Sequence, residues 1–281
     1  MAGCINNGMA GWTFTQTDIA EARRGERLLN PSIDLSNPCN LNCAYCFIEE
    51  KNSPRKVRFP DELSLEETLS VIDDFATAGA RSVNLVGAGE PTIDPAFQQI
   101  IERIGLKGMT PVVFTNGIHF NTHPELLDIL YAIGATVVVK FNSADPTLQD
   151  LLAGRKGYTV QRDTAIERLI YRGFAAHSPT RLAFDIIAMQ GVFGEITDIV
   201  RRCRRENILP IVTNFIPTGR TERGTFVGFA ALAALGQHER DKVRAALQPL
   251  TPSEQNALYH ALADIDRADF EIGHEELDPV V

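Results

Sequence analysis

Three cysteines, Cys39, Cys43 and Cys46, lie within eight residues of the sequence. Thiolates with this CxxxCxxC spacing on one loop converge on an iron–sulfur cubane and ligate three of its four irons. The fourth iron keeps an open coordination position, which allows a metal centre to bind and activate a small molecule. The other two cysteines, Cys4 and Cys203, are distant in the sequence. The spacing therefore predicts a single cluster with one free iron.

A structural zinc site or ordinary buried thiols are the alternatives for these cysteines. Zinc takes four ligands in such sites, usually from Cys and His, and no His neighbours the loop. A total of 5 cysteines is an odd number, and the first 30 residues show no secretion signal, which argues against a disulfide framework. A non-catalytic iron–sulfur or zinc protein that senses redox state or binds a partner is the second interpretation.

Short β-rich runs alternate with longer helical segments from Pro31 onward, which is typical of a parallel sheet covered by helices. The expected strands are 32–36, 82–86, 110–114, 136–141, 181–189 and 210–215. The expected helices are 64–78, 95–104, 124–133, 148–153, 159–171 and 194–206. Six such units do not close an eight-stranded barrel. We therefore expect an α/β fold, a partial (β/α)6 barrel whose working face lies at the C-terminal strand ends.

Flanking segments complete the expected organisation. Residues 1–30 are expected to form an N-terminal extension with a short helix, residues 31–220 the barrel, and residues 221–281 a mostly helical appendage. Ser64 and Glu67 form a capping-box pattern at the start of the first barrel helix.

Composition and charge restrict the class of protein. The chain is 44% hydrophobic and 22% charged, as in a globular protein with a large core. A net charge of -9 argues against a protein that mainly grips nucleic acid. No apolar run approaches the roughly 20 residues that span a bilayer. We expect a cytoplasmic protein that binds neither membranes nor nucleic acid.

The segment from Cys39 to Cys46, CNLNCAYC, resembles the cluster motif of the radical S-adenosylmethionine (radical SAM) superfamily. The resemblance implies one 4Fe–4S cluster held by Cys39, Cys43 and Cys46. It also implies that S-adenosylmethionine chelates the open iron and is cleaved reductively to a 5′-deoxyadenosyl radical. Tyr45 would then lie beside the adenine.

Residues 87–91, GAGEP, are similar to the Gly-Gly-Glu-Pro turn of this family, with Ala88 in place of one glycine. Small residues at Gly87, Ala88 and Gly89 let the backbone approach a ligand closely. The carboxylate of Glu90 suits the ammonium group of the methionine moiety.

Further polar residues end the third and fourth strands. Asn116, in Thr-Asn-Gly, resembles a family turn near cofactor or substrate. Relatives place polar residues against the ribose and the methionine carboxylate at the position of Lys140, Asn142 and Ser143. Lys140 is unusual there, and contact with the substrate is its alternative role.

Candidate substrate contacts come from the last two strands. Asp185 lies within a strand, where an unpartnered charge is costly, so it faces the cavity or pairs with a cation. Gln190 and Asn214 end strands five and six. Cys203, among four arginines, is either a hydrogen-atom donor with a lowered thiol pKa or a packing cysteine, and its place on an outer helix favours packing.

The resemblance extends from Ser32 to Phe215, and residues 215–220 resemble a segment of the SPASM/twitch branch. The cysteines for auxiliary clusters of that branch are not in this chain. The resemblance implies hydrogen abstraction from a small-molecule or peptide substrate, as in natural-product tailoring, with an external electron donor such as flavodoxin or ferredoxin. An activase for a glycyl-radical enzyme is an alternative.

Overall fold

A six-stranded parallel sheet forms the centre of the computed structural model, which describes residues 8–48, 58–221 and 237–275. The strand order β1-β2-β3-β4-β5-β6 follows the chain, so each helical crossover joins neighbouring strands. The strands are β1 (Ser32–Ile33), β2 (Ser82–Leu85), β3 (Thr110–Thr115), β4 (Thr136–Lys140), β5 (Leu182–Ala188) and β6 (Leu209–Asn214). The expected α/β partial barrel is confirmed.

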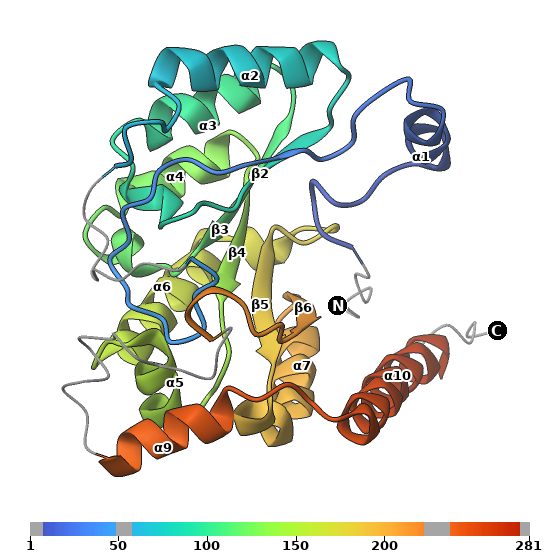
Figure 1. Cartoon of the computed structure of the whole chain (residues 1–281). Helices are drawn as coiled ribbons and strands as arrows, with labels where there is room; N and C mark the ends of the chain where they lie inside the picture. The colour runs from blue at the N-terminus through green and yellow to red at the C-terminus, as the bar shows by residue number, and fades with distance from the viewer. Residues whose placement is uncertain (1–7, 49–57, 222–236, 276–281) are drawn as a thin grey trace.

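Helices cover the outer face of the curved sheet, with α2, α3, α4 and α6 stacked along one side (Figure 1). The α-helices are α1 (Gln16–Arg23), α2 (Leu65–Thr77), α3 (Phe97–Leu106), α4 (Glu125–Ala132), α5 (Pro146–Ala153), α6 (Tyr158–Arg172), α7 (Ile196–Arg205), α9 (Gln237–Ala246) and α10 (Pro252–Glu275). Short 3-10 turns are η1 (Pro91–Ile93), η2 (Ile118–Asn121), η3 (Phe174–Ala176), η4 (Gln190–Glu195) and η5 (Gly219–Thr221).

The start of α2 agrees with its sequence signal, whereas the end of β1 does not. The capping box at the start of α2 is confirmed, since Ser64 and Glu67 exchange hydrogen bonds. The expected first strand, 32–36, is too long, because pairing in β1 stops at Ile33. Beyond it, the Ser36 carbonyl accepts a hydrogen bond from Gly89 N–H at 3.0 Å instead of joining the ladder.

Side chains alternate between two apolar environments along the central strands. Val137 and Val139 of β4 face the helices in the main core, whereas Val138 points into the barrel. There it packs with Met9, which comes from the N-terminal segment. The barrel interior is therefore filled at its lower level by a segment distant in sequence.

Residues 8–13 close the N-terminal mouth of the barrel, and this closing segment is called the N-terminal plug below. Its backbone oxygens accept hydrogen bonds from the first residues of two strands, Ser82 to Gly11 at 2.5 Å and Thr136 to Ala10 at 2.9 Å. Trp12 donates its indole N–H to Asn84 at 2.8 Å. The plug thus meets the strands at the end opposite to their polar C-terminal turns.

The C-terminal helices are joined to the barrel beside β5. The Gln190 N–H donates to the Gln248 carbonyl at 3.0 Å, and a Cβ atom at Gly191 would clash with Ala246 of α9. A mostly helical C-terminal tail is confirmed for residues 237–275. Residues 1–7, 222–236 and 276–281, which belong to the expected flanking segments, lie outside the described residues.

Within the described ranges, the structure contains no helix that is both long enough and apolar enough to cross a membrane.

We expect Gly11→Ala to lower the free energy of unfolding by about 2–4 kcal/mol, because a left-handed backbone costs a non-glycine residue about 1 kcal/mol and overpacking costs about 1–3 more. Gly11 has φ +85°, and its Cβ would lie 2.6 Å from Val112. Gly25, with φ +73° and nothing within 4 Å, is the matched control. Gly25→Ala should lower the free energy of unfolding only by the cost of the left-handed backbone, about 1 kcal/mol. Urea unfolding of both variants measures the difference, and equal losses would contradict the role of the plug.

Candidate active site

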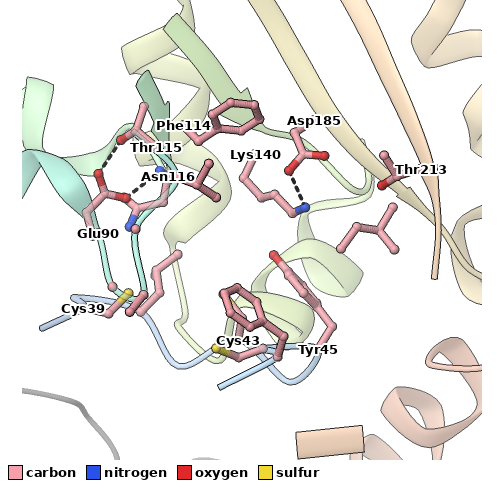
Figure 2. A pocket seen from close by; sticks show the side chains of 18 of the residues that line it. Cys39, Cys43, Tyr45, Glu90, Phe114, Thr115, Asn116, Lys140, Asp185 and Thr213 are labelled. Atoms are coloured by element: carbon pink, nitrogen blue, oxygen red, sulfur yellow. Dashed lines mark hydrogen bonds and ion pairs between the residues drawn. The ribbon is translucent and has the colours of Figure 1, made fainter. Parts of the chain in front are cut away.

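A cavity of about 290 Å³ opens at the C-terminal strand ends (Figure 2). All six strands contribute to it, either directly or through the turns that follow them. Its lining comprises Cys39, Leu41, Cys43, Tyr45, Cys46, Phe47, Val86, Gly87, Ala88, Gly89, Glu90, Phe114, Thr115, Asn116, Val138, Lys140, Asp185, Ile187, Thr213, Asn214, Phe215, Ile216 and Thr218. The three cysteines and most of the predicted polar residues therefore share one cavity.

The cysteine loop, residues 37–47, is attached to the C-terminal end of α5. Its Asn42 N–H donates to the Ala153 carbonyl at 3.1 Å, and its Ala44 N–H donates to the Leu152 carbonyl at 2.8 Å. The last carbonyls of a helix have no partner within the helix, so they are available as acceptors for another segment. The helix end thereby fixes the backbone between the first and last cysteines.

Three glycines from other parts of the chain press against the cysteine loop. A Cβ atom on any of them would overlap a carbonyl oxygen of the loop, in the pairs Gly89 with Pro38, Gly154 with Asn42, and Gly219 with Phe47. Only glycine permits so close an approach. The contacts lie before, within and after the three cysteines, so the whole loop is held by backbone packing.

Glu90 joins the turn after β2 to the turn after β3. Its Oε1 accepts a hydrogen bond from the Thr115 hydroxyl at 2.6 Å, and its Oε2 accepts one from the Asn116 N–H at 2.7 Å (Figure 2). Oε1 also accepts one from the Thr92 hydroxyl at 2.6 Å. Burial raises the pKa of Glu90, while these donors oppose the rise. Among the described residues, Oε2 has one donor, so it can accept another hydrogen bond from the cavity.

The electrostatics of Cys43 and Tyr45 are set mainly by burial. Burial, followed by the neighbouring thiols of Cys39 and Cys46, raises the pKa of the Cys43 thiol to about 12. Burial also raises the pKa of the Tyr45 hydroxyl. Metal binding to thiols requires the thiolate and releases protons. Metal loading at Cys43 must therefore displace a firmly held proton.

Lys140 and Asp185 form an ion pair across β4 and β5. The two residues are Cα partners in the sheet, and Lys140 Nζ lies 2.7 Å from Asp185 Oδ2. Lys140 Nζ also lies 5.5 Å from the centre of the Tyr45 ring. Asp185, expected to face the cavity or pair with a cation, does both here.

The remaining predicted residues lie at different depths. Asn142 and Ser143 are fully buried and are not among the cavity-lining residues. The Asn142 side-chain oxygen accepts from the Ile187 N–H at 3.0 Å, and the Ser143 hydroxyl donates to Glu195 at 2.7 Å. Their contact with a cofactor stays a prediction.

The two residues predicted at the ends of β5 and β6 differ in position. Asn214 lines the cavity and is exposed, whereas Gln190 is not one of the residues that line the cavity.

Cys203 lies in α7 within the main hydrophobic core and does not line the cavity. Burial raises the pKa of its thiol to about 12, despite the arginines beside it. This environment is that of a packing cysteine.

Two residues that organise the site were not predicted from sequence. Gln149 Oε1 accepts hydrogen bonds from the backbone N–H groups of Asn142 and Ser143 and from Arg162 Nη1, at 3.1, 2.9 and 2.9 Å. Arg162 is 1% exposed, and its guanidinium lies 3.8 Å from the Phe141 ring centre. One sequence signal could have identified Arg162. It lies on the apolar face of α6, where a buried charge requires a polar partner.

The sequence profile of the Radical SAM superfamily matches residues 33–224. The chain belongs to this superfamily. The sporulation killing factor maturation protein SkfB of Bacillus subtilis is 27% identical over 61% of this chain and 38% of its own length. The mycofactocin maturase MftC of Mycobacterium ulcerans is 26% identical over 66% of this chain and 47% of its own length.

Among solved structures, Streptococcus suis SuiB bound to S-adenosylmethionine matches with a TM-score of 0.57 and 16% identity. The match covers 73% of this chain and 46% of SuiB. SuiB bound to the precursor peptide SuiA matches with a TM-score of 0.55 and 18% identity, over 73% of this chain and 44% of that chain. These likenesses show the fold. The chain spans less than half the length of each of these relatives.

Radical SAM proteins bind a 4Fe–4S cluster and S-adenosylmethionine. The donor set of the cavity fits both groups. Three thiols on one loop suit an iron–sulfur cluster with an open iron. The available lone pair on Glu90 Oε2 suits an ammonium group.

We expect Gly154→Ala to weaken cluster binding about tenfold, the size of effect seen when groups that orient metal ligands are disturbed. The added Cβ would displace Asn42, between two of the cysteines. Gly157→Ala is the control, since Gly157 also has a positive φ, +76°, but nothing within 4 Å. Iron and sulfide retained per chain in competition with a chelator measure the effect. Equal retention in both variants would refute the packing argument.

Proposed function

We propose that this protein is an enzyme that cleaves S-adenosylmethionine reductively and abstracts hydrogen from a peptide or small-molecule substrate. The observation that carries the proposal is one cavity lined by the three cysteines and by the turns after β2 and β3. When bound, the cluster would supply the electron that breaks the C5′–S bond of S-adenosylmethionine and gives methionine and a 5′-deoxyadenosyl radical. Superfamily membership supports this chemistry.

The protein groups would divide the work of holding the two cofactors. Cys39, Cys43 and Cys46 would ligate the cluster. Oε2 of Glu90 would accept a hydrogen bond from the methionine ammonium, while its other oxygen keeps the two turns together. The remaining proposed contacts are Tyr45 at the adenine, the backbone of Gly87, Ala88 and Gly89, and the polar groups of Asn116, Asn142 and Ser143.

The charges of the cavity favour a peptide over a phosphorylated nucleotide as substrate. Phosphate groups are recognised by several Arg or Lys side chains. Among the described lining residues, Lys140 is the one cationic side chain, and it is paired with Asp185. The names of SkfB and MftC as maturation proteins, and the SuiB complex with a precursor peptide, are consistent with a peptide. Asn214 is a candidate contact at the rim.

The reaction also needs an electron from outside the chain. We propose flavodoxin or ferredoxin as the donor. A cytoplasmic location accords with this choice, because the cysteines must remain reduced until the cluster forms.

Anaerobic reconstitution tests the proposed function. The wild-type chain should bind about four irons and about four sulfides and should form 5′-deoxyadenosine when reduced with S-adenosylmethionine present. Cys43→Ala should lose both the cluster and the cleavage, because a ligand is removed. Cys203→Ala is the matched control, since Cys203 is buried in the core outside the cavity. One zinc per chain without cleavage would reject the proposal.

A further inference from the structure

The Lys140–Asp185 ion pair lies inside the barrel, near the C-terminal ends of β4 and β5. Lys140 and Asp185 occupy inward positions of these neighbouring strands, and Phe114 lies near the end of the adjacent strand β3. Below them, Val138 packs against the plug residue Met9. The pair therefore lies between the cysteine loop, whose Tyr45 ring centre is 5.5 Å from Lys140 Nζ, and the closed floor of the barrel.

Hydrogen-bonding capacity is left over on both members of the pair. Lys140 has three N–H donors, and one is directed to Asp185 Oδ2. In the part of the chain that the structure describes, the other two N–H groups and Asp185 Oδ1 have no hydrogen-bond partner. The side chains are 19% and 20% exposed, and both line the cavity. A donor and an acceptor are thus presented side by side to a ligand.

The apolar residues around the ion pair favour a ligand group that is polar but uncharged. Phe114, Val138 and Ile187 line the cavity beside it and provide apolar surface. In such surroundings an added charge without its own partner is costly, whereas a neutral polar group with satisfied hydrogen bonds is tolerated. The ion pair is already balanced, so a charged ligand group would leave one charge unpaired.

We propose that the Lys140–Asp185 pair binds a carboxamide group of the substrate, from an Asn or Gln side chain of a peptide. The carboxamide oxygen accepts from Lys140, and its NH₂ group donates to Asp185 Oδ1. A primary carboxamide has its acceptor oxygen and one of its donor N–H groups on the same side of the group. A trans peptide group directs its oxygen and its hydrogen to opposite sides. This inference rests on the proposed function and names the substrate class of the same cavity.

The test uses the reconstituted holoenzyme with S-adenosylmethionine and three peptides, acetyl-Ala-X-Ala-methylamide with X as Gln, Glu or Leu. Anaerobic equilibrium dialysis measures their affinities. The Gln peptide should bind about tenfold more tightly than the Leu and Glu peptides. Lys140→Met should reduce the Gln affinity to the level of the Leu peptide.

Two further variants control this measurement. Lys107→Met removes a lysine from a surface pair with Asp73, 3.0 Å apart, and should keep the Gln preference. If Lys140→Met does not fold because Asp185 is left unpaired, Lys140→Met with Asp185→Leu replaces the whole pair by apolar groups and should lose the preference as well.

Three results would overturn the inference. They are equal binding of the Gln and Leu peptides, tighter binding of the Glu peptide, or a loss of S-adenosylmethionine affinity in Lys140→Met that exceeds the loss of Gln affinity. Formation of 5′-deoxyadenosine without peptide tests the proposed function separately, so failure of one does not imply failure of the other.

Discussion

Close backbone packing around the cysteine loop is the constraint on which the site depends. Gly89, Gly154 and Gly219 approach carbonyl oxygens of the loop at distances that no Cβ atom allows. The last carbonyls of α5 complete the attachment by accepting two loop N–H groups. Thiols on a free loop would sample many arrangements. Here their positions follow from rigid contacts between backbones, each of which belongs to a different part of the barrel.

Buried polar side chains give the strand-end turns similar precision. Glu90 ties two turns together through its carboxylate, and Gln149 with Arg162 holds the turn after β4. A buried polar group left without a partner costs about 1–3 kcal/mol, so each network favours one arrangement of its turn. The cavity therefore has a polar rim fixed by hydrogen bonds and a lower part of apolar residues. Lys140 and Asp185 occupy the boundary between the two.

The strand–helix rhythm and the α2 capping box were predictable because they depend on local periodicity and on side chains three residues apart. The gathering of the cysteines with Glu90 and Asn116 was also predictable, because parallel strands bring their C-terminal ends to one edge. The support of the turn by Gln149 and Arg162 was not, since their partners come from tertiary packing. The early end of β1 has the same origin, because Ser36 bonds to the turn at Gly89. The sequence showed that Lys140 departs from the family pattern. It could not show that Lys140 pairs with Asp185, because that depends on the register of β4 against β5.

The N-terminal plug has a consequence for the order in which the chain folds. Residues 8–13 are synthesised before all six strands, whereas Thr180, whose N–H donates to the Gly8 carbonyl at 3.2 Å, is synthesised much later. Thr136 and Ser82, which also bond to the plug, are synthesised in between. The plug can therefore complete its hydrogen bonds to the barrel only after the chain has been synthesised as far as Thr180. The plug is thus synthesised before the strands that it covers but reaches its native contacts after them, and until then the inward faces of β3, β4 and β5 stay accessible to water.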